Sequence, residues 1–183
     1  MRIGKPIYNW DKWRLPIDTV VIHHSSSSPT ISEIEISAVH LLNLYIKQFM
    51  TDEDVKNTAI YSGHYPPGAN TDTKNMTFAS YHYLIRPNGK VIELNHKSAF
   101  LWHAGNLDIN RRSVGIVFAG KFTGNKRPTE KAIESFKKLK SQEFKNIEAE
   151  RIFGHCEVIK KEILGTTECP GESLAMWKKY LLS

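Results

Sequence analysis

Cysteine is scarce in this sequence, which has only Cys156 and Cys169 among its 183 residues. This scarcity excludes the disulfide-dense scaffolds of small secreted proteins. Long hydrophobic runs are absent as well. No run approaches the roughly 20 apolar residues that cross a bilayer, and the start, residues 1–6, lacks the apolar stretch of a secretory signal. We therefore expect a chain that is synthesised in the cytoplasm without a signal peptide and has no membrane span.

Internal repeats and low-complexity tracts are also missing, which excludes solenoids and repeat arrays. No change of composition marks a linker between two domains. A chain of 183 residues is near the size of one ordinary domain and is long enough to bury a core. We predict a single domain over residues 1–183 and expect a monomer.

Acidic residues are in the minority, because 25 Lys and Arg face 19 Asp and Glu and give a net charge of +6. Much of the excess lies in lysine-rich segments such as 131–145 and 178–179, which would attract any polyanion. Nucleic acid is one such partner, but no recognisable nucleic-acid-binding motif accompanies the charge. The anionic polymers of a bacterial wall fit the charge equally well, so charge alone does not identify a partner.

Short β-branched runs alternate with amphipathic segments along the chain. The runs predict strands over residues 19–23, 81–86, 90–94, 113–119 and 151–153. Apolar residues at helical spacing predict helices over residues 32–50, from 128 onward and over 172–182. Asn88-Gly89 predicts a hairpin between the second and third strands. The fold class is therefore α/β, with a central mixed sheet flanked by helices.

Residues 51–79 form a long polar stretch that is rich in turn-forming residues, including Pro66-Pro67-Gly68. Loops of this length inside a domain are usually functional or disordered. We interpret the stretch as a wall of a substrate groove. A surface excursion without a function is the alternative.

Two histidines and one cysteine occupy positions that suit a metal site at the rim of the sheet. His23 ends the first predicted strand, His155 follows the last one, and Cys169 lies in the turn-rich segment 167–171. Two imidazoles and a thiolate that leave a fourth position to water form a catalytic rather than a structural zinc site. The open alternatives are an accidental trio, since the chain has eight histidines, and a disulfide between Cys156 and Cys169.

Further motifs stand between these residues in a definite order. They are Tyr81-His82-Tyr83, Pro87-Asn88-Gly89-Lys90, Trp102-His103-Ala104-Gly105-Asn106 and Ser113-Val114-Gly115-Ile116-Val117. With the trio, the series from Thr19 to Gly171 resembles the type 2 N-acetylmuramoyl-L-alanine amidases, which include phage lysozyme-amidases and peptidoglycan recognition proteins. The resemblance implies that His23, His155 and Cys169 bind zinc. A cytoplasmic start and this match favour the metal over a disulfide and leave Cys156 as a packed free thiol.

The resemblance also implies roles for residues around the metal. Tyr81 occupies the position of the family's catalytic tyrosine, whose phenol can donate a hydrogen bond to an oxyanion. Thr167 stands where many relatives carry a lysine, and a hydroxyl stabilises an oxyanion less strongly than a cation does. His103 and Asn106 resemble the substrate-side segment, so we predict that they bind substrate; for His103, a loop histidine without a task is the alternative. Strand alternation places Tyr83 on the same face as Tyr81.

The activity that the resemblance implies is hydrolysis of the amide bond between N-acetylmuramic acid and the L-alanine of peptidoglycan. Residues 115–120 contain no carboxylate, whereas the family's branch that recycles wall fragments in the cytoplasm carries a glutamate in this strand. This departure favours a phage or prophage endolysin that acts on the wall after release from the cytoplasm. The alternatives are a cytoplasmic amidase for soluble muropeptides, a non-catalytic peptidoglycan-recognition module, and a basic protein that binds nucleic acid or a polymerase.

Overall fold

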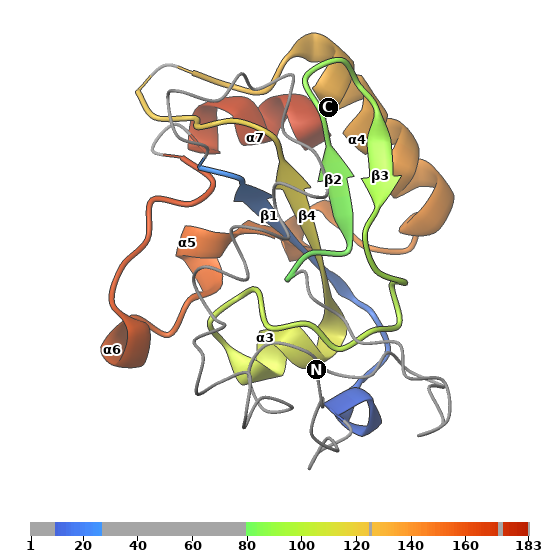
Figure 1. Cartoon of the computed structure of the whole chain (residues 1–183), viewed down its shortest axis with the longest axis vertical. Helices are drawn as coiled ribbons and strands as arrows, with labels where there is room; N and C mark the ends of the chain where they lie inside the picture. The colour runs from blue at the N-terminus through green and yellow to red at the C-terminus, as the bar shows by residue number, and fades with distance from the viewer. Residues whose placement is uncertain (1–9, 27–79, 125, 172–173, 183) are drawn as a thin grey trace, which may run out of the picture.

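The described residues form one five-stranded mixed sheet in the order β3-β2-β4-β1-β5 (Figure 1). This computed structural model describes residues 10–26, 80–124, 126–171 and 174–182. The strands are β1 (Thr19–His24), β2 (Tyr83–Ile85), β3 (Val91–Glu93), β4 (Ser113–Phe118) and β5 (Ile152–Gly154). Strand β1 pairs in parallel with β4 and β5, β2 pairs in parallel with β4, and β2 and β3 form an antiparallel hairpin.

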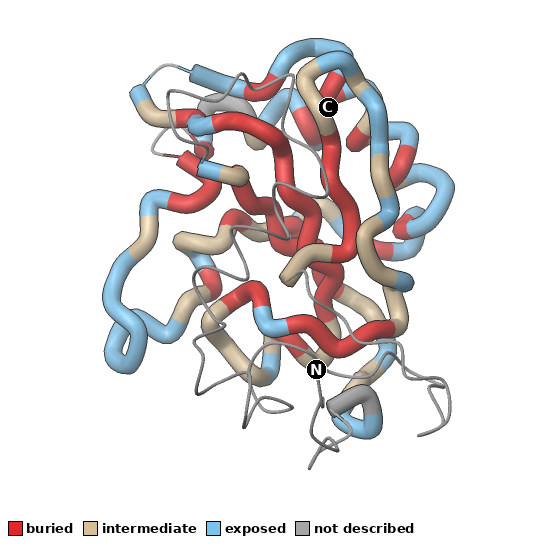
Figure 2. The backbone as a smooth tube through the Cα atoms, viewed as in Figure 1, coloured by how far each residue is buried: buried red, intermediate tan, exposed pale blue. Residues whose placement is uncertain are grey.

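The two central strands, β1 and β4, are buried at every position (Figure 2). Both carry continuous apolar, β-branched runs, which is the pattern expected for parallel strands covered on both faces. The hairpin turn uses Gly89 at φ +87°, a conformation that residues with a Cβ rarely adopt. The predicted mixed sheet and hairpin are therefore confirmed.

The helices cover both faces of the sheet. They are η1 (Trp10–Trp13), α3 (Leu107–Arg112), α4 (Glu130–Glu143), η2 (Ala149–Arg151), α5 (His155–Val158), α6 (Lys161–Leu164) and α7 (Leu174–Leu182). Helix α4 is capped by Thr129, whose hydroxyl accepts a hydrogen bond from the N–H of Ala132. Its residues Ile133 and Phe136 pack on one face of the sheet together with Leu174 and Leu181 of α7. Helices α3 and α5 lie against the other face.

The expected helices from residue 128 and over 172–182 correspond to α4 and α7, whereas α3, α5 and α6 were not predicted. These three contain only four to six residues each, too few for a clear helical period. The expected helix over 32–50 and the loop over 51–79 lie outside the described residues. Within the part of the chain that is described, no helix has the length and apolar character needed to cross a membrane.

Tyr81 and Tyr83 pack on opposite faces of the sheet, so the prediction that they share one face is wrong. Tyr81 packs with Leu84, whereas Tyr83 belongs to the cluster that α4 covers. The predicted strand over 81–86 is shorter than expected, since β2 begins only at Tyr83 and the chain bends at residue 82. The bend breaks the strand alternation on which the prediction depended.

Candidate active site

His23 and His155 stand at the carboxyl ends of neighbouring parallel strands. The pairing of Ile22 with Gly154 places His23, near the end of β1, beside His155, the first residue after β5. A Cβ on Gly154 would lie only 2.3 Å from Leu174 Cδ2 and 2.8 Å from Pro170 Cδ. Glycine therefore allows the turn between β5 and α5 to pack against the segment that follows Cys169.

Three hydrogen bonds hold Cys169 at this edge of the sheet. The N–H of Cys156 donates to the carbonyl of Cys169 at 2.7 Å, which ties the cysteine loop to α5. The N–H of His24 donates to Cys169 Sγ at 3.4 Å, which ties it to β1. The N–H of Cys169 donates to the hydroxyl of Thr167 at 3.2 Å. Both cysteines are free thiols, with Cys156 half-buried, so the structure contains no disulfide between them.

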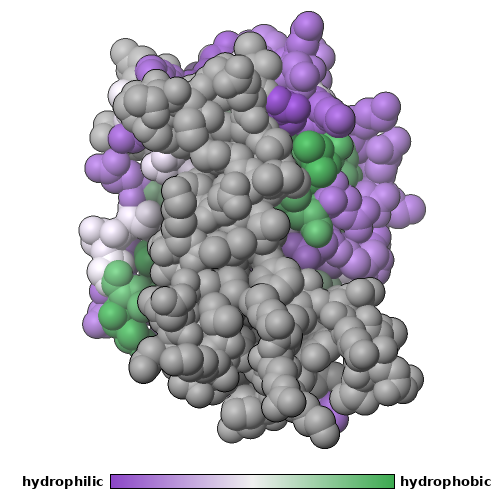
Figure 3. Space-filling view, in the orientation of Figure 1, coloured by the Kyte–Doolittle hydropathy of each residue, from purple (hydrophilic) through white to green (hydrophobic). Residues whose placement is uncertain are grey.

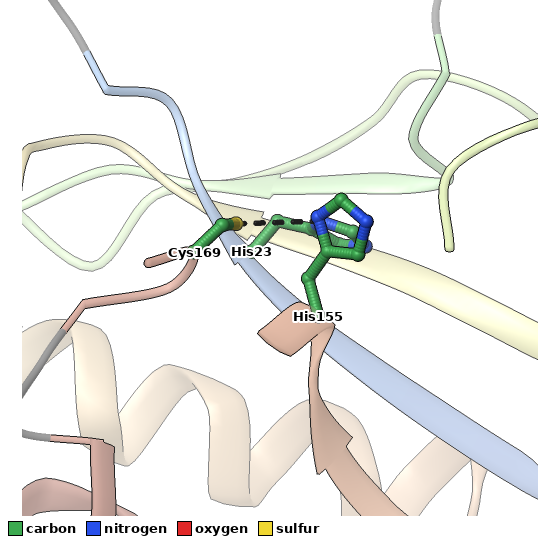
Figure 4. A group of neighbouring side chains, drawn as sticks. All are labelled: His23, His155 and Cys169. Carbon is green, nitrogen blue, oxygen red and sulfur yellow. Dashed lines mark hydrogen bonds between the residues drawn. The ribbon is translucent and has the colours of Figure 1, made fainter. Parts of the chain in front are cut away.

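The side chains of His23, His155 and Cys169 converge from three separate segments (Figure 4). One potential ligand atom from each lies within 4.8 Å of the others. His23 Nδ1 is 3.6 Å from Cys169 Sγ, and the ring centroids of His23 and His155 are 4.8 Å apart. His155 Nε2 is buried and has no hydrogen-bond partner among the described residues. An unpaired buried nitrogen beside a thiol and a second imidazole fits a metal ion.

Burial controls the protonation of this group. Burial lowers the pKa of His23 well below its ordinary value and lowers the pKa of His155 to about 4, so both rings are neutral near pH 7. Burial raises the pKa of the Cys169 thiol to about 12. A bound cation would reverse this last effect by stabilising the thiolate. Two neutral imidazoles and one soft sulfur suit zinc and exclude the oxygen-ligand sites of magnesium and calcium.

We expect the metal-free protein to lose stability as the pH falls from about 6.5 to about 4. In this window the unfolded chain protonates His155, whose unfolded pKa is about 6.5, whereas the folded chain does not until about pH 4. Lowering the pH through this window therefore reduces the free energy of unfolding, by about 3 kcal/mol from His155 alone. Denaturant titrations across the pH range measure the effect. His155→Gln should weaken this pH dependence of stability, whereas His96→Gln, at an exposed site, should not. Equal pH dependence in the unchanged protein and both variants would contradict the assignment of the effect to His155.

Tyr81 lies beside the trio. Its ring centroid is 4.9 Å from that of His23, at an interplanar angle of 51°. Its carbonyl accepts a hydrogen bond of 2.8 Å from the side-chain amide of Asn95, which fixes the backbone before β2. Burial raises the pKa of the Tyr81 phenol further above its ordinary value, with Cys169 adding to the shift. The phenol therefore keeps its proton and can act as a hydrogen-bond donor.

A polar cleft of about 550 Å³ opens next to Cys169. The lining residues are His24, Ser26, Lys121, Thr166, Thr167, Glu168 and Cys169. The volume is within the range of small-ligand sites. Thr167 and the exposed Lys121 thus line the same cleft as Cys169.

His103 and Asn106, which the sequence predicted as substrate-binding residues, have hydrogen-bond partners inside the protein. His103 is 6% exposed, and its two ring nitrogens face His23 Nε2 and Ser113 Oγ, each at 3.1 Å. The Asn106 side chain accepts from the N–H of Asp108 at the start of α3 and donates to the carbonyl of Val158. Sequence reasoning missed Ser113; its only signal was its place at the start of the fourth predicted strand.

The model of the N-acetylmuramoyl-L-alanine amidase family matches residues 13–172. The chain belongs to this family. The match includes all three residues of the trio as well as Tyr81 and Thr167. The resemblance inferred from the ordered motifs is therefore confirmed at the level of the family.

Individual relatives of this amidase-family chain include both recognition proteins and amidases. Peptidoglycan-recognition protein SD of Drosophila melanogaster is 36% identical over 97 residues, which cover 51% of this chain and 47% of the relative. The match therefore spans about half the length of that curated protein. The crystal structure of the Drosophila protein has a TM-score of 0.56 and 27% identity, over 86% of this chain and 76% of its own.

Two further structures share the fold at lower identity. The endolysin amidase LysCS from Clostridium intestinale URNW has a TM-score of 0.58 and 18% identity, covering 90% of this chain and 85% of its own. The crystal structure of an AmpD derivative has a TM-score of 0.62 and 16% identity, covering 99% and 93%. At these identities the likeness describes the fold of the chain and not its activity.

Proposed function

We propose that this chain is a zinc-dependent N-acetylmuramoyl-L-alanine amidase that hydrolyses the amide bond between N-acetylmuramic acid and L-alanine. The observation that carries the proposal is the convergence of His23, His155 and Cys169 beside a buried tyrosine. Their donor set fits a zinc ion, and Cys169 also lines a polar cleft whose volume suits a small ligand. Membership of the amidase family supports the same activity.

Zinc in a three-ligand site supplies a nucleophile at neutral pH and polarises a carbonyl. The residues of the chain contribute the remaining interactions. Tyr81, whose phenol stays protonated, donates a hydrogen bond to the negative charge that develops on the amide oxygen. Thr167 accepts the N–H of Cys169 through its hydroxyl oxygen, so its hydroxyl hydrogen serves as a second donor to that charge.

The cleft indicates how a wall fragment would be held. Muropeptides are polar and carry carboxylates, and Lys121, a cationic residue, is among the residues that line the cleft. The charged residues of α4 form a hydrophilic surface on a separate side of the molecule, next to β3 (Figure 3). We propose that the substrate is the wall polymer and that the chain acts as an endolysin of phage or prophage origin. The lack of a carboxylate in residues 115–120 supports this choice.

Peptidoglycan recognition without cleavage is a second candidate function. The observation that favours it is the 36% identity to a peptidoglycan-recognition protein over 97 residues; in the structure comparisons, that protein is 27% identical and the LysCS endolysin 18%. The intact set of three ligands favours hydrolysis, since recognition alone has no need for a catalytic metal site.

We expect the zinc-loaded protein to release intact stem peptides with a free L-alanine amino terminus from purified peptidoglycan. Polymer and soluble muropeptides are incubated separately and the products are identified by mass spectrometry. A chelator should stop the release, because the metal supplies the nucleophile, and added zinc should restore it. Binding to the wall without any product, in a preparation shown to contain zinc, would instead establish a recognition module.

A further inference from the structure

We propose that His103 is a positioning residue, which acts through His23 and holds its Nδ1 toward the metal site with the help of Ser113. The two ring nitrogens of His23 face opposite partners. Nδ1 is 3.6 Å from Cys169 Sγ, and Nε2 is 3.1 Å from His103 Nδ1. The inference rests on the proposed role of His23 as a metal ligand, and the substrate contact of His103 stays a separate prediction.

The direction of the hydrogen bonds follows from the chemistry of a neutral imidazole, in which one nitrogen donates and the other accepts. A ring that ligates a metal through Nδ1 must carry its proton on Nε2. His23 then donates to His103 Nδ1, and His103 must donate through Nε2 to Ser113 Oγ, which is 3.1 Å away. This chain of hydrogen bonds therefore requires one tautomer of each ring, with the proton on Nε2 in both His23 and His103.

The thiol of Cys169 supports the same direction in the metal-free protein. Its sulfur already accepts the N–H of His24 at 3.4 Å. The thiol hydrogen can then be donated toward His23 Nδ1, 3.6 Å away. This arrangement leaves Nε2 of His23 as the nitrogen that carries the proton and donates it to His103.

The backbone around His103 is built to hold this ring. The side-chain oxygen of Asn110, a fully buried residue, accepts the N–H groups of both His103 and Ala104, at 3.2 and 2.9 Å. A Cβ on Gly115 would lie 2.9 Å from two atoms of the imidazole, so glycine in β4 makes room for it. A ring this well fixed is preorganised to orient its neighbour.

His82 completes the packing of the ring. Its centroid is 5.9 Å from that of His103, at an interplanar angle of 88°. His82 Nδ1 accepts the N–H of Gly115 at 3.0 Å, so its Nε2 donates to the carbonyl of Ala99, also at 3.0 Å. His82 therefore supports His103 by ring contact, while both nitrogens of His103 remain directed at His23 and Ser113.

Zinc affinity, measured by competition with a chelator, tests the inference. We expect His103→Leu to weaken zinc binding about 10- to 100-fold, the usual cost of losing a partner that orients a metal-ligating histidine. His103→Asn, which keeps an acceptor oxygen near the position of Nδ1, should restore much of the affinity. Ser113→Ala should cause a smaller loss, and His96→Leu, at an exposed site, should bind zinc as the unchanged protein does.

Nitrogen-15 NMR of the histidine rings gives a second readout that needs neither zinc nor activity. In the unchanged, metal-free protein we expect His23 to carry its proton on Nε2. A proton on Nδ1 of His23, or full zinc affinity in a folded His103→Leu variant, would overturn the inference. Equal losses in His103→Asn and His103→Leu would do so too, since packing alone would then explain them. An unchanged protein with the expected tautomer but without zinc affinity would instead contradict the proposed metal site.

Discussion

Replacing Cys169 with alanine is expected to abolish zinc binding and amidase activity together. Cys169 provides the only sulfur of the trio, and its Sγ is 3.6 Å from His23 Nδ1. Without it the site retains two imidazoles, which is fewer than the three protein ligands of catalytic zinc sites. The loss of zinc affinity should exceed the about 100-fold that removing a hydrogen-bond partner of a ligand costs.

The matched control for this prediction is Cys156→Ala. Cys156 is half-buried, and its contribution to the cysteine loop is a backbone N–H that alanine retains. Zinc content by elemental analysis and stem-peptide release by mass spectrometry are measured for both variants. Normal zinc content in Cys169→Ala would exclude the proposed ligand set. Equal losses in the two variants would indicate that the loop, not the thiol, had failed.

The sheet and the two strand-end histidines could be predicted because each depends on local pattern. The run from Val20 to Ile22 is continuously apolar, and β1 is fully buried as such a run requires. His23 and His155 lie at neighbouring strand ends because β1 and β5 pair in parallel, with Ile22 opposite Gly154. Periodicity predicts the two strands and therefore the strand-end place of each histidine, whereas the pairing that makes the two strands neighbours is known only from the structure.

The partners of His103 could not be predicted, because they depend on three-dimensional packing. Its contact with His23 joins residues 80 positions apart. Whether its ring faces the cleft or the sheet depends on the space beside Gly115 and on the Asn110 side chain, neither of which periodicity describes. The capping role of Asn106 was missed as well, although asparagine before a short helix is typical of an N-cap, and its predicted substrate contact stays a prediction.

Tyr81 shows how a local bend can change the meaning of a motif. Regular alternation would have placed Tyr81 and Tyr83 on one face and made them equivalent candidates. The bend at residue 82 separates them, so that Tyr81 contacts His23 while Tyr83 packs against Phe144 in the cluster under α4. The chain therefore offers two tyrosines of similar sequence context, only one of which is near the trio.

This separation makes Tyr81→Phe a sharp test of the proposed chemistry. We expect kcat to fall about 100- to 1000-fold, the usual cost of removing one donor to a developing oxyanion. The KM should change little, because the hydrogen bond forms in the transition state and not with the bound substrate. Zinc affinity should also be unchanged, since phenylalanine keeps the ring that contacts His23 at 4.9 Å.

Tyr83→Phe is the control, because it removes a phenol from the same motif on the opposite face of the sheet. Kinetics of stem-peptide release and zinc affinity are measured for both variants. Full activity in Tyr81→Phe would show that the phenol does not stabilise the transition state and would leave Thr167 as the proposed donor. Loss of zinc in Tyr81→Phe would instead mean that the tyrosine supports the metal site. Only a reduced kcat with zinc retained, together with an active Tyr83→Phe, agrees with Tyr81 as a donor to the reacting amide.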